Sequence, residues 1–218
     1  MTTANNNSNR PDIRAYIGQT GSGKGVSIRE HLQAEQPARL VVWDPLGEYG
    51  AHVTMTTGKL AEVAKHMAQK SFRVAYWPGA DVAAFREKFA LFCRMVFAAG
   101  NCTMLVEELA DVTSPSYAPV HWKYCTTKGR HRGLKIIAAS QRPAQVDKDF
   151  FGGCTYVRCF VLRYKPDRKA MADSMDVPME KIIGLSTVEA GNVTTINYIE
   201  RDFRINKTTE GTIKKRRK

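Results

Sequence analysis

Short apolar runs alternate with longer stretches of mixed polarity along most of this chain. Apolar runs without a polar face are typical of strands buried on both faces of a parallel sheet. Such strands are predicted at residues 13–17, 40–44, 72–76, 102–106, 135–139 and 156–162. Helices are predicted between them at residues 25–33, 59–69, 81–99 and 120–127, and from residues 167 and 179 onward. This alternation predicts an α/β domain built on a mainly parallel sheet.

The longest predicted helix carries an aromatic stripe, and the C-terminal region follows a different pattern. Within residues 81–99, Phe85, Phe89, Phe92 and Val96 fall on one helical face, which indicates core packing rather than a cofactor site. Residues 193–205 instead alternate between polar and apolar positions. That period predicts a β-hairpin at the C-terminal side of the domain.

The turn between the first strand and the first helix is rich in glycine and ends in lysine. Residues 18–24 read Gly-Gln-Thr-Gly-Ser-Gly-Lys, the G-x-x-x-x-G-K pattern of a phosphate-binding loop, or P-loop. Glycines let backbone N–H groups surround the phosphates, the helix N-terminus adds positive charge, and Lys24 reaches the β- and γ-phosphates. The residues expected to contact ATP are Gly18, Gln19, Thr20, Gly21, Ser22, Gly23, Lys24, Gly25 and Val26.

One position of this loop departs from the pattern. A Ser or Thr that ligates Mg²⁺ usually follows the lysine, whereas this chain has Gly25. Ser27, Thr20 or a water would have to replace that hydroxyl, or carboxylates elsewhere would hold the metal. The Lys24–Gly25 pair also occurs in adenylate-kinase-like enzymes, so a small nucleotide or nucleoside kinase stays open as an alternative function.

Several predicted strands end in residues that suit phosphate chemistry. In an open parallel sheet, ligands gather beyond the carboxyl ends of the strands. Here those ends carry Asp44, the pair Glu107–Glu108, and Gln141. We expect Glu107, with Ser27, to hold Mg²⁺ and Glu108 to activate water, although a Glu at the metal position leaves an exchange of the two roles open. Gln141 is expected to contact both the γ-phosphate and the attacking water.

Two arginines precede the fifth predicted strand, at its amino end. Arg130 and Arg132 lie on a basic turn and cannot easily reach a nucleotide at the opposite edge of the same sheet. They could reach the nucleotide of a neighbouring subunit, as an arginine finger does. Binding of a phosphate backbone, or plain surface charge, remains the alternative.

Charge is the unusual part of the composition. The net charge is +12, and the terminal run Lys214-Lys215-Arg216-Arg217-Lys218 carries five of those charges. Such a balance favours a polyanionic partner, although a disordered solubilising end would look the same. Cysteines 93, 102, 125, 154 and 159 form no C-x-x-C pair and are expected to be reduced core residues. We expect a disordered lead-in at 1–9, one domain at 10–207, a basic tail at 208–218, and no membrane span.

Four segments together resemble the FtsK–HerA superfamily of DNA-pumping ATPases. Residues 41–49 resemble its D-x-x-G-E-Y motif, residues 128–135 its basic turn, residues 139–143 its sensor strand with Q-R-P, and residues 159–172 its following strand and D-R helix. The resemblance implies a RecA-like P-loop domain of the additional-strand, catalytic-glutamate class. A bare motor of this size resembles the genome-packaging ATPases of tailless, membrane-containing (tectivirus-type) viruses.

The viral resemblance implies partners and a location as well. It implies a ring, expected to be a hexamer, that drives double-stranded DNA into a capsid at a unique vertex, with vertex proteins as partners. The protein would then act in the host cytoplasm and at the virion vertex. Three alternatives remain: a HerA-like cellular or plasmid translocase, the small kinase, and a filamentous-phage assembly protein, which usually carries a membrane span.

Overall fold

The computed structural model describes residues 9–216, and all structural statements below concern this part of the chain. Most of the expected lead-in (1–8) and the last two tail residues (217–218) lie outside the described residues. The strands are β1 (Asp12–Ile17), β2 (Arg39–Trp43), β3 (Met55–Thr57), β4 (Phe72–Tyr76), β5 (Thr103–Val106), β6 (Lys135–Ser140), β7 (Tyr156–Cys159), β8 (Thr187–Ala190), β9 (Val193–Asp202) and β10 (Lys207–Arg216).

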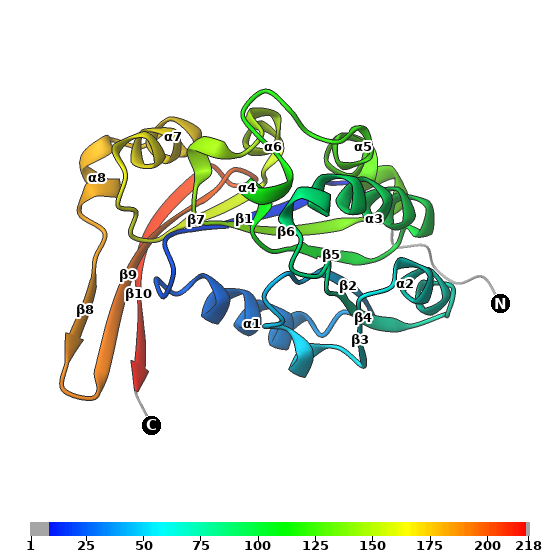
Figure 1. The fold of residues 1–218 in the computed structure, drawn as a ribbon. Coiled ribbons are helices and arrows are strands. Elements are labelled where there is room, and N and C mark those ends of the chain that lie inside the picture. The colour runs from blue at the N-terminus through cyan, green and yellow to red at the C-terminus, as the bar shows by residue number, and fades with distance from the viewer. Residues whose placement is uncertain (1–8, 217–218) are drawn as a thin grey trace.

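The strands form one sheet in the order β10-β9-β7-β1-β6-β5-β2-β4-β3, with β8 also paired to β9 (Figure 1). All pairs among β1 to β7 are parallel, and β9 runs antiparallel to β7, β8 and β10. Strand β6 lies between β1, which leads into the P-loop, and β5, which leads into Glu107. This intervening strand defines the additional-strand class, so the predicted fold class is confirmed.

Helices cover both faces of the parallel part of the sheet. They are α1 (Lys24–Glu35), α2 (Leu60–Met67), α3 (Phe85–Ala99), α4 (Leu109–Val112), α5 (Val120–Lys128), α6 (Lys148–Gly153), α7 (Lys165–Met175) and α8 (Met179–Ile183). In Figure 1, α1 lies below the sheet, and α3 to α7 lie above it. Described helices include none that is long and apolar enough to cross a bilayer.

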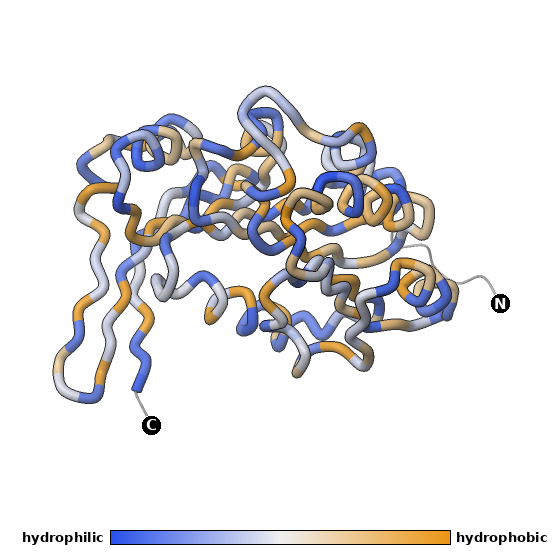
Figure 2. Tube along the Cα trace, in the orientation of Figure 1, coloured by the Kyte–Doolittle hydropathy of each residue, from blue (hydrophilic) through white to orange (hydrophobic). Residues whose placement is uncertain are grey.

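Alternate residues of each central strand enter different core clusters. Val41 and Trp43 belong to the larger cluster, whereas Leu40 and Val42 pack with Ile28 of α1. Such strands read as continuous apolar runs because both faces are buried, and Figure 2 shows the hydrophobic positions concentrated there. The expected aromatic stripe of α3 packs on Trp43, with ring centroids 5.1–5.8 Å apart. All five cysteines are buried and free, as predicted.

The predicted C-terminal β-hairpin is present, but its bounds differ from the prediction. Residues 193–202 form only its first arm, and the second arm is β10 at 207–216. The segment from 208 to 216, which we expected to begin a separate tail, is therefore the edge strand of the sheet. Its basic residues fit this place because an edge strand tolerates lysine and is protected by it against unwanted pairing.

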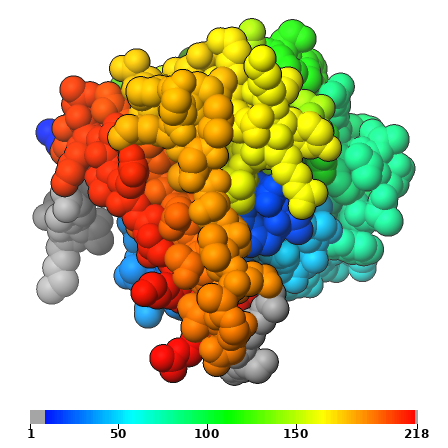
Figure 3. All heavy atoms as spheres, turned by 90° about the vertical axis from the view of Figure 1, so that its left-hand side faces the viewer, coloured from blue at the N-terminus to red at the C-terminus, as the bar shows by residue number. Residues whose placement is uncertain are grey.

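Strands β8, β9 and β10 reach beyond the parallel sheet. Only residues 199–202 of β9 pair with β7, while residues 193–198 pair with β8 and β10 alone. We call this three-stranded extension the C-terminal arm. Figure 1 shows it descending past the start of α1, and Figure 3 shows it over one side of the molecule, below α7 and α8.

Candidate active site

The P-loop is held between two strand ends. The Gly18 N–H donates to the Ser140 carbonyl at 3.2 Å, and the Gln19 N–H donates to the Val161 carbonyl at 3.1 Å. A Cβ on Gly18 would lie 2.7 Å from Cβ of Phe160, so only glycine fits there. Gly21 and Gly23 have φ of +75° and +106°, which residues other than glycine rarely adopt. The loop therefore has the backbone that the motif predicts.

Lys24 lies inside the loop that precedes it. Its ammonium group donates to the carbonyls of Gly18 at 2.7 Å and Gln19 at 3.3 Å. Burial lowers the pKa of Lys24, while the carboxylates of Glu108, Glu107 and Glu48 act in the opposite direction. These three carboxylates offset the positive charge of Lys24. A further anion, such as a phosphate group, is therefore attracted strongly only if other positive groups contribute.

The P-loop borders a cavity of about 330 Å³. Glu107, Glu108 and Gln141 line it together with the loop, so the structure brings the predicted strand-end residues to one place. The C-terminal arm forms part of the wall through Thr187, Glu189, Thr194, Ile196 and Lys215. Sequence reasoning missed these five residues. The alternating pattern marked only Thr194 and Ile196 as strand residues, and nothing in it indicated that the strands return to the P-loop.

Glu107 is the more deeply buried of the two strand-end acids. It is 5% exposed, and it accepts a hydrogen bond from the Tyr49 hydroxyl. Burial raises the pKa of Glu107 to about 7, although the Tyr49 hydrogen bond and the charge of Lys24 lower it. Asp44 explains the place of Tyr49, because its carboxylate accepts from the backbone N–H groups of Glu48 at 2.9 Å and Tyr49 at 3.0 Å. The D-x-x-G-E-Y segment thus orients Glu107.

Glu108 lies at the start of a hydrogen-bonded chain. Its backbone is left-handed, with φ of +49°, and its carboxylate accepts from the Gln141 amide nitrogen. The Gln141 carbonyl oxygen accepts in turn from the Thr20 hydroxyl at 2.6 Å. The chain Thr20–Gln141–Glu108 therefore connects the P-loop to the residue expected to activate water.

The next residue of the Q-R-P segment is fixed from another helix. Arg142 donates to the carboxylate of Asp167 at 2.9 Å, and Asp167 is 1% exposed. The second oxygen of Asp167 accepts from the Ala144 N–H at 3.0 Å. Asp167 belongs to α7 and to the D-R part of the predicted motif set, so these two motifs form one structural unit that supports Gln141.

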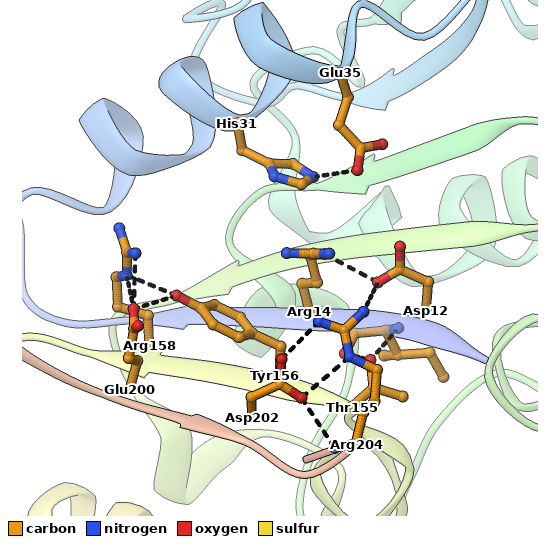
Figure 4. A network of polar contacts seen from close by, with 11 residues as sticks. Asp12, Arg14, His31, Glu35, Thr155, Tyr156, Arg158, Glu200, Asp202 and Arg204 are labelled. Carbon is orange, nitrogen blue, oxygen red and sulfur yellow. Dashed lines mark hydrogen bonds and ion pairs between the residues drawn. The ribbon is translucent and has the colours of Figure 1, made fainter. Parts of the chain in front are cut away.

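Ser27, one of the expected metal ligands, lies elsewhere. It accepts a hydrogen bond from Arg158 at 2.9 Å and faces a second, polar cavity between α1 and the sheet rather than the P-loop cavity. Arg158 also forms an ion pair with Glu200 at 2.7 Å, and Tyr156 donates to the same carboxylate. Figure 4 shows these side chains directed toward one another between β7 and β9. The structure does not bring the Ser27 hydroxyl to the site.

The ligands that the cavity still offers Mg²⁺ are carboxylates and the Thr20 hydroxyl. Among residues 9–216, no group of three or more His, Cys, Asp or Glu side chains is placed to hold a metal. Mg²⁺ commonly keeps several waters and binds through one or two carboxylates plus phosphate oxygens. Glu107 and Glu108 fit that mode, whereas the loop supplies no hydroxyl from position 25 or 27.

Arg130 and Arg132 lie just before the amino end of β6, on the side of the sheet opposite the cavity, as predicted. Arg132 donates to the backbone carbonyls of Phe97 at 3.2 Å and Ala98 at 2.6 Å, at the end of α3. Arg130 is exposed, and its hydrogen bond goes to its neighbour His131. The structure does not bring either arginine to the cavity of its own chain.

This fold and this site are those of a P-loop NTPase domain, as the resemblance to the FtsK–HerA superfamily implied, because a G-S-G-K loop, a strand-end Glu pair and Gln141 meet across an additional strand. The chain belongs to the same family as Protein P9 of Pseudoalteromonas phage PM2, to which it is 30% identical over 176 residues, 79% of this chain and 78% of P9. No protein-family model matches it.

Solved structures of the same fold include those of a viral protein. The genome packaging NTPase B204 of Sulfolobus turreted icosahedral virus 2, in complex with AMPPCP, superposes with a TM-score of 0.69 at 14% identity, covering 92% of this chain and 96% of B204. Its complex with ATP-gammaS gives a TM-score of 0.68 at 14% identity, with the same coverage. At this identity, the comparison establishes the shared fold.

Proposed function

We propose that this protein is an ATPase that drives double-stranded DNA into a viral capsid. The Thr20–Gln141–Glu108 chain beside Lys24 carries the proposal, because it connects a phosphate-binding loop to a carboxylate that can accept a proton from water. Membership of a family that includes a phage protein and the fold of a genome packaging NTPase support the viral role over a cellular or plasmid translocase.

The geometry suggests how hydrolysis would proceed. ATP phosphates would take the place of the loop carbonyls as partners of the Lys24 ammonium group. Glu108 would accept the proton of the attacking water, and Gln141 would hold that water against the γ-phosphate. Mg²⁺, held by Glu107, would supply positive charge to the phosphates.

The proposed assembly follows from the position of the arginines. Since Arg130 and Arg132 lie across the sheet from the cavity, they would complete the site of a neighbouring subunit in a ring, with a hexamer as the expected size. Basic residues, including Lys215 and the end of the chain, would hold DNA phosphates without regard to sequence, so binding should weaken steeply with salt. The ring would work at a capsid vertex, in the host cytoplasm during assembly.

The test is ATP hydrolysis with and without duplex DNA. We expect stimulation by DNA, loss of nucleotide binding and hydrolysis in Lys24→Ala, and a loss of about 10² to 10⁴-fold in hydrolysis with retained binding in Glu108→Gln. Glu87→Gln, an exposed acid on α3, is the matched control. Hydrolysis unchanged in Lys24→Ala, or phosphate transfer to AMP by a monomer, would contradict the proposal.

A further inference from the structure

The P-loop pattern expects a Ser or Thr at position 25, and in this structure an arginine side chain lies where that side chain would be. If Gly25 carried a Cβ, that atom would lie 3.1 Å from Nη1 and 3.4 Å from Nη2 of Arg29. Arg29 follows Gly25 by four residues on α1, so the two positions share one helical face. The guanidinium group therefore fills the space in which a Ser or Thr side chain would lie in an ordinary P-loop.

Arg29 also lies in the wall of the P-loop cavity, which Lys24, Glu107 and Glu108 line as well. Within residues 9–216 its one ion pair is with Glu48, at 3.8 Å, and both side chains are partly exposed. An ion pair of that length and exposure is weak. The guanidinium group is thus free to exchange Glu48 for a stronger anionic partner.

A nucleotide phosphate is such a partner. The cavity presents the carboxylates of Glu48, Glu107 and Glu108 near Lys24, so a triphosphate entering it needs positive charge beyond one ammonium group. Guanidinium groups bind phosphate oxygens through paired, charge-assisted hydrogen bonds, and their charge does not titrate near neutral pH.

We propose that Arg29 binds the phosphates of the nucleotide from the side where other P-loops place a Mg²⁺-ligating hydroxyl, and that it makes nucleotide binding only weakly dependent on Mg²⁺. This inference rests on the proposed function, since it concerns the same cavity. It assigns Gly25 a role as well, because a side chain at that position would displace the guanidinium group.

The test is calorimetric binding of ATP-gammaS in excess Mg²⁺ and in EDTA. We expect the protein to bind in both conditions, with affinities that differ by less than about tenfold. Loss of one charge-assisted contact should weaken binding of Arg29→Gln by about tenfold or more in EDTA, and Mg²⁺ should restore part of it. Gly25→Ser should make binding more Mg²⁺-dependent, because Arg29 must move.

The controls separate failure of this inference from failure of the proposed function. Arg94→Gln removes an exposed arginine of α3 and should bind like the parent protein. Gly25→Ser is expected to fold, because the atoms it would displace are at the end of a flexible side chain, and a thermal melt checks this. If the parent protein binds, Lys24→Ala does not, and Arg29→Gln matches the parent in EDTA, the Arg29 role is wrong. Binding that vanishes in EDTA overturns it too. If Lys24→Ala binds normally, the proposed function itself fails.

Discussion

Glu107 and Glu108 are neighbours in the sequence but have different surroundings. Glu107 is buried against the Tyr49 hydroxyl, and its pKa is raised to about 7 by burial. Glu108 turns into a left-handed conformation that brings its carboxylate to Gln141. The sequence predicted the pair and the sensor because each follows a buried strand. The division of roles between the two acids remains a prediction.

The raised pKa of Glu107 predicts a pH-dependent stability. In the folded protein Glu107 keeps a proton up to about pH 7, whereas its reference pKa is 4.5. The folded state therefore binds more protons than the unfolded state in this window, and stability falls as the pH rises through it. Glu107→Gln cannot ionise, so we expect it to gain stability over the parent protein from pH 5 to pH 8, by up to about 3 kcal/mol.

Urea unfolding at pH 5 and at pH 8 measures the difference in free energy of unfolding between Glu107→Gln and the parent protein. Glu87→Gln serves as the control, since its carboxylate is exposed on α3. If that difference is the same at pH 5 and pH 8, the raised pKa of Glu107 does not contribute to stability as predicted.

Ser27 provides a second test at the residue scale. Because its hydroxyl accepts from Arg158 and lies away from the cavity, Ser27→Ala should leave the Mg²⁺ concentration for half-maximal hydrolysis unchanged. It should cost about 1 kcal/mol of stability through the lost hydrogen bond. A marked rise in the Mg²⁺ requirement, measured by titrating the ATPase rate, would restore Ser27 as a ligand. The sequence could not decide this, because spacing from the loop does not fix the direction of a hydroxyl.

The sequence predicted strands well where both faces of the strand are buried, and less well where one face is exposed. The parallel strands β1, β2, β4, β5 and β6 lie close to their predicted positions, because continuous apolar runs leave little choice of register. The bounds of the C-terminal hairpin were wrong, since a period of two specifies a strand without specifying where its partner begins. The same limit hid the arm's contribution to the cavity, which depends on the length of β9 beyond β7.

Ile196 of β9 tests whether the arm serves the site. A Cβ on Gly23 would lie 3.2 Å from Cγ2 of Ile196, so this side chain covers the P-loop. Ile199, on the same strand, belongs to the main core instead. Both residues are almost fully buried, so both alanine variants should lose about 2–5 kcal/mol of stability.

Nucleotide affinity should separate the two variants. Ile196→Ala is expected to bind ATP-gammaS several-fold more weakly than Ile199→Ala, measured at a temperature where melts show both to be folded. Equal affinities would mean that the arm only completes the sheet.

At the scale of the whole molecule, the sheet separates two sets of candidate functional residues. The P-loop, Glu108 and Gln141 lie beyond the carboxyl ends of the strands, whereas Arg130 and Arg132 precede β6 at the other edge. One chain cannot bring both sets to one nucleotide without unfolding the sheet. A ring in which each subunit presents its basic turn to the next would join them.

The two arginines are not equivalent in this respect. The Arg132 guanidinium group binds the last carbonyls of α3, so Arg132→Ala should mainly lower stability, by about 1–3 kcal/mol. Arg130 is exposed and is bonded to its neighbour His131, so it is the residue that can cross to another subunit. We therefore expect Arg130→Ala to abolish DNA-stimulated hydrolysis while retaining ATP binding.

Mixing two inactive variants would show whether Arg130 acts between subunits. In a ring, Lys24→Ala lacks nucleotide but still offers its Arg130, and Arg130→Ala binds nucleotide but lacks the arginine. Mixed rings then contain sites with an intact P-loop next to an intact Arg130, so hydrolysis should reappear in the mixture. Glu108→Gln mixed with Lys24→Ala is the control: neither partner combines an intact P-loop with an intact Glu108, and both residues act within one chain, so activity should stay absent. If the mixture of Lys24→Ala and Arg130→Ala does not hydrolyse ATP, Arg130 would instead be assigned to binding of DNA phosphates.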